Sequence, residues 1–260
     1  MAFRKLYDPA NGQMRVAGLM SGSGSNLRKI IEHERNLESS KGRAPYSVVV
    51  IFSENPKSNA IRIGDAFGIP VVTRDLGAFY ETKGKPRKDL SVRAEFDEGT
   101  VDALKKFEVT VAAYAGYMSI ATNPLINAFL GINVHPADLS IMDEGRRKYT
   151  GDKAVKKAIL AGETWIRSST HIIESQVDYG RILMISPQLR VILPDGFNPD
   201  NAEQLKVESE KNQDRLKEIG DWIIFPKTLE HLANGRYSQD ENCLLYFDNK
   251  PISFGLKLEN

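Results

Sequence analysis

Cysteine is almost absent from this chain of 260 residues, in which Cys243 is the only one. A single thiol cannot form an internal disulfide, which favours a reducing, cytoplasmic location. The four histidines are scattered and show no metal-ligand spacing, so we expect no bound metal. Neither sign of charge dominates, because 35 basic residues face 34 acidic ones. This balance gives no support for a partner that is a nucleic acid or a membrane surface.

Long apolar runs are missing as well. No segment approaches the roughly 20 apolar residues that a membrane-spanning helix needs. The N-terminal residues 1–6 lack the apolar core of a secretion signal. The chain is long enough to bury a full hydrophobic core.

Apolar runs of strand length alternate with helical segments through the first two-thirds of the chain. Residues 48–52 are continuously apolar, as expected for a strand that is buried on both faces. The alternation predicts an α/β fold with a doubly wound, mostly parallel sheet, which binds ligands at the carboxyl ends of its strands. We expect strands at 14–20, 47–53, 69–73, 109–115, 131–135, 167–174 and 181–186, and helices near 25–35, 58–67, 93–107, 122–129 and 151–161.

Beyond residue 190 the pattern changes. Residues 203–233 form a long helical stretch, in which Gly220 and Pro226 predict breaks. Two short runs then flank a polar turn at 239–242, which predicts a small terminal hairpin rather than a separate domain.

The most informative segment is the predicted strand that ends at Asn133-Val134-His135-Pro136. Residues i and i+2 of a strand point to the same face, so Asn133 and His135 should project together. An amide donor beside a titratable imidazole can stabilise an oxyanion and move a proton. The alternative is a strand-end histidine whose ring is satisfied by a backbone carbonyl.

A run of small residues, Gly22, Ser23, Gly24, Ser25 and Asn26, lies between the first predicted strand and helix. Glycines let backbone N–H groups approach an anion, and the helix N-terminus adds its positive dipole. We therefore predict phosphate binding here, with an ordinary capped turn as the alternative.

A third polar turn contains Asp178 and follows the strand predicted at 167–174. Asp near a turn glycine is often turn chemistry alone. If this carboxylate lies near His135, it should raise the pKa of the imidazole and favour the imidazolium.

Together these segments resemble the phosphoribosylglycinamide formyltransferase family, folate-dependent enzymes of purine synthesis. The resemblance runs from about Met14 to about Gly255. It implies one Rossmann-like domain over 1–260, with an N-terminal extension (1–13), a phosphate-binding half (14–135) and a folate-binding and C-terminal half (136–260). It also implies transfer of a formyl group from 10-formyltetrahydrofolate to the amine of glycinamide ribonucleotide, with small-molecule partners and a monomer or homodimer.

The resemblance assigns roles to individual residues. Asn133, His135 and Asp178 match the family's catalytic residues. The residues implied in binding the phosphorylated acceptor are Gly22, Ser23, Gly24, Ser25, Asn26, Gly116 and Asp221. Those implied in binding the folate are Arg93, Met118, Ser119, Ile120, Val134, Ile173 and Glu174.

The chain also departs from the family. A longer loop, 141–148, follows His135, and Ser119 stands where the family has an arginine. Tyr179 replaces the first glycine of the usual Asp-Gly-Gly, and Asp221 replaces a substrate-binding glutamate. These substitutions leave formyl transfer as the expected reaction and leave a different acceptor amine open.

The sequence disfavours four other functions. A non-catalytic ligand-binding relative is disfavoured because Asn133, His135 and Asp178 are all present. A 10-formyltetrahydrofolate hydrolase could use the same three residues, but such relatives usually carry an additional N-terminal domain. A methionyl-tRNA formyltransferase is disfavoured because a tRNA-binding C-terminal domain is not found. A nicotinamide-dependent enzyme is disfavoured because Leu27 occupies the third glycine position of a dinucleotide motif.

Two basic segments remain. Residues 74–92 contain Lys83, Lys85, Arg87 and Lys88, and we expect a solvated loop there, with contact to the glutamate tail of the folate as the alternative. The trio at 146–148, Arg-Arg-Lys, is also expected to lie on the surface.

Overall fold

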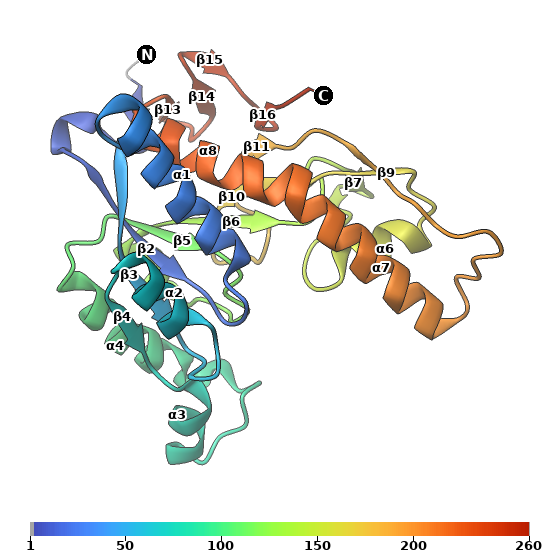
Figure 1. The fold of residues 1–260 in the computed structure, drawn as a ribbon, viewed down its shortest axis with the longest axis horizontal. Helices are drawn as coiled ribbons and strands as arrows, with labels where there is room; N and C mark the ends of the chain where they lie inside the picture. The colour runs from blue at the N-terminus through green and yellow to red at the C-terminus, as the bar shows by residue number, and fades with distance from the viewer. Residues whose placement is uncertain (1–2, 260) are drawn as a thin grey trace.

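A twisted sheet of eight strands forms the centre of the computed structural model, which describes residues 3–259 (Figure 1). The strands lie in the order β16-β11-β10-β6-β5-β2-β3-β4. Neighbouring strands from β4 to β6 are parallel, whereas β10 is antiparallel to both β6 and β11. The predicted doubly wound, mostly parallel sheet is confirmed. The strand bounds are β2 Met14–Leu19, β3 Tyr46–Ser53, β4 Val71–Thr73, β5 Val111–Tyr114, β6 Leu130–His135, β10 Ser169–Ile172, β11 Ile182–Ile185 and β16 Leu256–Lys257.

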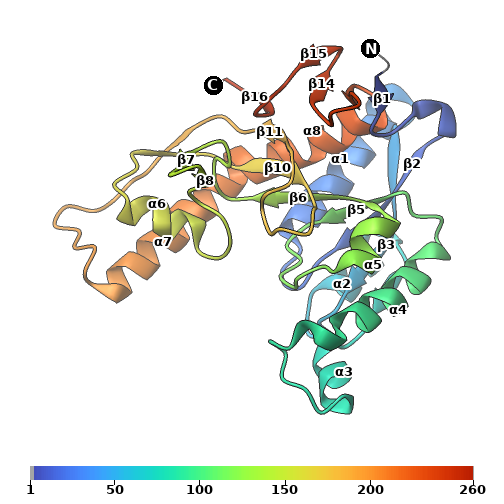
Figure 2. The same ribbon diagram turned by 180° about the vertical axis from the view of Figure 1, so that it is seen from behind.

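Helices cover both faces of this sheet (Figures 1 and 2). Successive residues of β2 show the two faces: Val16 packs with α1 and α8, whereas Ala17 packs with α4 and α5. This follows from the alternation of side chains along a strand. The helix bounds are α1 Ser25–Lys41, α2 Ala60–Phe67, α3 Leu76–Thr82, α4 Arg93–Lys105, α5 Asn123–Ala128, α6 Ala154–Leu160, α7 Ala202–Leu216 and α8 Trp222–Ala233.

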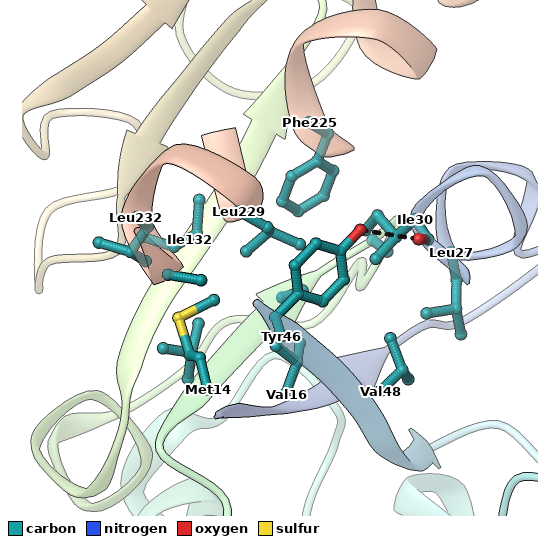
Figure 3. Close-up of a cluster of buried hydrophobic side chains, with 14 of the residues drawn as sticks. Met14, Val16, Leu27, Ile30, Tyr46, Val48, Ile132, Phe225, Leu229 and Leu232 are labelled. Carbon is teal, nitrogen blue, oxygen red and sulfur yellow. Dashed lines mark hydrogen bonds between the residues drawn. The ribbon is translucent and has the colours of Figure 1, made fainter. Parts of the chain in front are cut away.

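The larger hydrophobic core lies between the sheet and the α1–α8 pair (Figure 3). Leu229 and Phe225 of α8 and Val16 of β2 are fully buried there. Tyr46 of β3 is fully buried as well, and its hydroxyl donates to the carbonyl of Ile30 at 2.9 Å. Because this bond satisfies the phenol, a polar side chain can sit inside an apolar cluster.

The long C-terminal helical stretch is continuous, and the break predicted at Pro226 is wrong. A π-helical turn, Lys217–Asp221, joins α7 to α8, and Pro226 lies inside α8. Proline removes only one backbone donor, and burial of the surrounding apolar residues holds the helix together. Gly220 lies in the π turn, where a Cβ would come within 2.7 Å of the Ser168 hydroxyl oxygen. The small residue therefore permits close contact between this turn and β10.

The prediction of a solvated loop at 74–92 is also wrong in part. This segment contains α3 and a 3₁₀ turn at Leu90–Val92. Leu76 and Tyr80 of α3 are buried in the core on the α4 side of the sheet. The burial of these two side chains holds the segment against the core. Lys83, Lys85, Arg87 and Lys88 are exposed, as expected, whereas Arg74 at the start of the segment is partly buried.

Smaller sheets complete the fold. β1 (Arg4–Lys5) pairs with β13 (Tyr237–Gln239), which pairs with β14 (Leu245–Phe247) and then β15 (Lys250–Pro251). The N-terminal segment thus joins the predicted terminal hairpin. Two further antiparallel pairs are β7 (Met142–Asp143) with β8 (Arg146–Arg147), which form a hairpin, and β9 (Trp165–Ile166) with β12 (Leu189–Arg190). Within residues 3–259, no helix combines the length and apolar character that crossing a membrane requires.

Candidate active site

A single cavity of about 740 Å³ gathers nearly all the residues that the sequence singled out. It lies where β2, β5 and β6 end, which is the edge that the parallel topology predicts for ligand binding. All three predicted catalytic residues line it, with all seven predicted for the acceptor and six of the seven predicted for the folate. Arg93 is the exception.

Asn133 and His135 both lie on β6 and both face this cavity. The antiparallel neighbour β10 places His171 directly opposite Asn133. The Asn133 Nδ2 lies 3.2 Å from His171 Nε2. His171 Nδ1 donates to the carbonyl of Ile172 at 2.9 Å, which fixes the orientation of the ring beside the asparagine amide. The amide of Asn133 is therefore oriented by a histidine that sequence reasoning missed.

Asp178 completes the group from the loop between β10 and β11. Its Oδ2 lies 3.5 Å from His135 Nδ1, and its Oδ1 lies 3.3 Å from His171 Nε2. The backbone N–H of Gly151 donates to Oδ2 at 2.7 Å. Burial by itself would raise the pKa of Asp178, but the His171 contact, the attraction of His135 and the Gly151 bond outweigh it and lower the pKa to about 2. The carboxylate is therefore ionised at neutral pH.

The expectation that His135 would be an imidazolium is wrong for the unliganded protein. Burial lowers the pKa of His135 below its usual 6.5, and the opposing attraction of Asp178 does not restore it. The ring nitrogen Nε2 lies 2.8 Å from the carbonyl of Tyr149, and because a carbonyl only accepts, Nε2 carries the proton. The ring is thus tied to a backbone carbonyl, as the alternative interpretation expects, and it also lines the cavity, while its catalytic role stays a prediction.

The glycine-serine turn forms the opposite end of the cavity. Gly24 adopts a left-handed conformation, with φ of 71°, and begins α1 without a side-chain cap. The carbonyl of Gly22 accepts from the N–H of Asn59, which anchors the turn. The N–H groups of Gly22, Ser23 and Gly24 donate to no residue within 3–259. Unpaired donors at the start of a 17-residue helix suit an anion.

Asp221 lies at the end of the π turn and lines the same end of the cavity. Its carboxylate accepts from the Ser168 hydroxyl at 2.5 Å and from the Asn26 amide at 3.3 Å. Burial raises the pKa of Asp221, and these two hydrogen bonds oppose the rise. Asn26 therefore links the glycine-serine turn to a buried acid from the other end of the chain.

Two of the predicted folate residues, Met118 and Ile120, form an exposed apolar lip of the cavity together with Val177. Met118, Ile120 and Val177 are exposed at 74%, 44% and 52%, although all are apolar and line the cavity. Ser119 donates to the buried carboxylate of Glu54 at 3.0 Å. Exposed apolar side chains around a pocket are typical of a binding surface.

Arg93 lies away from the cavity lining. It is 4% exposed and its guanidinium carbon lies over the rings of Tyr80 and Phe96, at 5.6 and 5.8 Å. Its role in folate binding stays a prediction. Its contacts with one ring of α3 and one ring of α4 indicate that Arg93 also has a structural role.

Other lining residues had no signal in the sequence. Lys217 comes from the π turn, and Gly151 to Lys153 come from the loop before α6. Only the pairing of β6 with β10 and the path of the long helix bring them to the cavity. No group of three or more His, Cys, Asp or Glu residues suited to a metal ion occurs within the described range 3–259.

A doubly wound sheet whose carboxyl edge combines an amide, an imidazole, a carboxylate and an anion turn defines a class of group-transfer enzyme. Residues 14–206 match the formyl transferase family, and the chain belongs to this family. The phosphoribosylglycinamide formyltransferase of Haemophilus influenzae is 26% identical over 240 residues, covering 92% of this chain and 95% of the relative.

One further relative is similar in sequence, and one solved structure is similar in fold. The trifunctional purine biosynthetic protein adenosine-3 of Drosophila melanogaster is 30% identical over 224 residues, which are 85% of this chain but 14% of that protein. The crystal structure of phosphoribosylglycinamide formyltransferase from Anaplasma phagocytophilum shares the fold, with a TM-score of 0.69 at 20% identity. The match covers 95% of this chain and 100% of that one.

Proposed function

We propose that the protein transfers a formyl group from 10-formyltetrahydrofolate to the amine of glycinamide ribonucleotide. The observation that carries this proposal is the convergence of Asn133, His135 and Asp178 on one cavity that also contains the unpaired N–H groups at Gly22 to Gly24. The resemblance in sequence to phosphoribosylglycinamide formyltransferases supports the choice of substrates.

The cavity suits two substrates that meet at its centre. Its volume of about 740 Å³ falls within the range of roughly 300–1,000 Å³ that is usual for small-molecule sites. The lip at Met118, Ile120 and Val177 would cover the apolar faces of the folate, which supplies the formyl group. The glycine-serine turn would bind the phosphate of the acceptor, with Lys217 and Asp221 near the same end.

The chemistry follows from the groups between these two ends. The acceptor amine attacks the formyl carbon, and the carbonyl oxygen becomes an oxyanion. The side-chain amide of Asn133, held beside His171, can donate a hydrogen bond to the oxyanion. Such a donor is typically worth about 10²–10³ in rate.

His135 and Asp178 would transfer the proton that the acceptor amine loses. The neutral imidazole can take up a proton at Nδ1, beside the ionised Asp178 carboxylate, which stabilises the imidazolium that forms. The proton from the amine then passes to the leaving nitrogen of the folate. His135 is thus the proton carrier and Asp178 is its charged partner.

The test is to incubate the protein with 10-formyltetrahydrofolate and glycinamide ribonucleotide and to follow the formylated product by mass spectrometry. We expect turnover by the wild type and a loss of about 10²–10³ in kcat for Asn133→Ala. Folate binding should persist in that variant. Formate release without the acceptor would indicate a hydrolase, and absence of formylated product with intact folate binding would reject glycinamide ribonucleotide as the acceptor.

A further inference from the structure

The loop 141–148, which lengthens the segment after His135, is folded against the site. β7 and β8 form a two-residue ladder that pairs Met142 with Arg147 and Asp143 with Arg146. The turn residues Glu144 and Gly145 have φ of 46° and 77°, as in the two-residue hairpin turns that match the twist of the strands. This compact hairpin fixes the position of the Arg147 backbone, from which its side chain extends.

Arg147 contacts the catalytic loop directly, so the prediction that the whole basic trio lies on the surface is wrong for this residue. Its Nη1 donates to the backbone carbonyl of Asp178 at 2.5 Å and to that of Gly180 at 2.9 Å. Its guanidinium carbon lies 5.7 Å from the ring centroid of Tyr179. One side chain therefore holds three consecutive residues of the loop.

The loop needs such an anchor because its backbone is unfavourable. Asp178 has φ of 58°, the left-handed region that side-chain-bearing residues rarely occupy. Gly180 is pressed against β10, where a Cβ would come within 1.8 Å of the carbonyl oxygen of Ile172. Asp178 therefore keeps this strained conformation only if contacts with the surrounding structure stabilise it.

We propose that Arg147 is a positioning residue for the formyl transfer reaction, one that holds the Asp178 carboxylate between His135 and His171 through the backbone of Asp178. The inference rests on the proposed function. Asp178 is then fixed at both ends, by Arg147 at its carbonyl and by Gly151 and the two histidines at its carboxylate. Arg147 and Tyr179 would act together, and both lie where this chain departs from its family resemblance.

The kinetic test compares Arg147→Ala with Arg146→Ala. Arg146 is the matched control because its side chain is exposed and makes no hydrogen bond or ion pair with residues 3–259. A displacement of a catalytic group by about 1 Å can cost roughly 10²-fold, so we expect kcat of Arg147→Ala to fall by about 10- to 100-fold. The KM values for both substrates should change little, and added guanidinium ion should restore part of kcat to Arg147→Ala.

A second readout needs no substrate. The protein has four histidines, so the imidazole of His135 can be assigned and titrated by NMR. The charged or titratable groups that act on it are Asp178, His171 and Lys157. Because Asp178 attracts the protonated ring, displacement of its carboxylate in Arg147→Ala should move the titration of His135 to lower pH, while Arg146→Ala should leave it unchanged.

The outcomes separate the two proposals. A lower kcat and a shifted His135 titration in Arg147→Ala support the positioning role, whereas wild-type values of both overturn it. If the wild type does not formylate glycinamide ribonucleotide, the proposed function fails and the titration still decides the role of Arg147. If Arg147→Ala does not fold, Arg147→Met, which keeps the aliphatic stem but removes the donor to the carbonyls, is used in its place with the same criteria.

Discussion

At the scale of single residues, His135 illustrates a competition between burial and charge. The ring is 7% exposed, and removal from water disfavours its charged form. Asp178 favours the charged form but lies 3.5 Å away, beyond a normal hydrogen bond. Burial therefore prevails, and the resting protein keeps a neutral base beside an ionised carboxylate.

The direction of this shift fixes the pH dependence of turnover. Since the pKa of His135 lies below 6.5, the ring is neutral at pH 7 and becomes protonated as the pH falls below that value. If the neutral ring accepts the proton, kcat/KM on glycinamide ribonucleotide should be flat above pH 6.5 and decline at lower pH.

The measurement is a pH profile of kcat/KM between pH 5 and 8, with His231→Gln as a control, because His231 does not line the cavity. The decline should persist in His231→Gln and the activity should be nearly abolished in His135→Ala. An increase of kcat/KM toward acid pH would instead identify the imidazolium as the active form.

At the scale of elements, the turn between β2 and α1 separates two uses of glycine. Gly24 has φ of 71°, and a Cβ there would lie 2.5 Å from Ile63 Cδ1. Gly22 has no atom within 4 Å of the position of a Cβ, and its φ is not in the left-handed region. Gly24 is therefore needed by the fold, whereas the space beside Gly22 is open.

This contrast predicts different consequences for two similar substitutions. Gly24→Ala should destabilise the protein by roughly 1–2 kcal/mol or more, because an alanine in the left-handed region adds strain to the steric contact. Gly22→Ala should leave stability unchanged and raise the KM for the acceptor much more than that for the folate.

Thermal unfolding and steady-state kinetics of both variants test this. Equal increases in the two KM values for Gly22→Ala would show that the turn does not serve the phosphate alone.

At the scale of the whole molecule, the long C-terminal helix joins parts of the chain that are far apart in sequence. Asp221 receives hydrogen bonds from Asn26, near the N-terminus, and from Ser168, next to β10. Further along, Leu229 packs into the core that β2, β3 and α1 share (Figure 3). The position of Asp221 at the cavity therefore depends on the packing of α8.

Leu229→Ala should lower the free energy of unfolding by about 2–5 kcal/mol, because Leu229 is fully buried and the substitution leaves a cavity. Ile223→Ala, on the exposed side of the same helix, is the control. It should change the free energy of unfolding by about 0.5 kcal/mol or less. Denaturant unfolding of the two variants measures the difference. Similar losses would mean that helix propensity, not packing, determines the contribution of α8.

The sequence by itself determined the features that depend on local patterns. Apolar runs of strand length located every strand of the central sheet except β16, and the small residues at 22–26 located a turn that lines the cavity. The spacing of Asn133 and His135 placed both on one face of β6, because strand geometry is fixed by neighbours in the chain.

Tertiary structure decided what depends on residues that are distant in sequence. The antiparallel pairing of β10 with β6 brought His171 to Asn133, and no local pattern encodes that register. Burial set the charge of His135, and burial is a property of the whole fold. The hairpin at 142–147 carried Arg147 to the loop of Asp178, although a run of basic residues alone predicts an exposed surface.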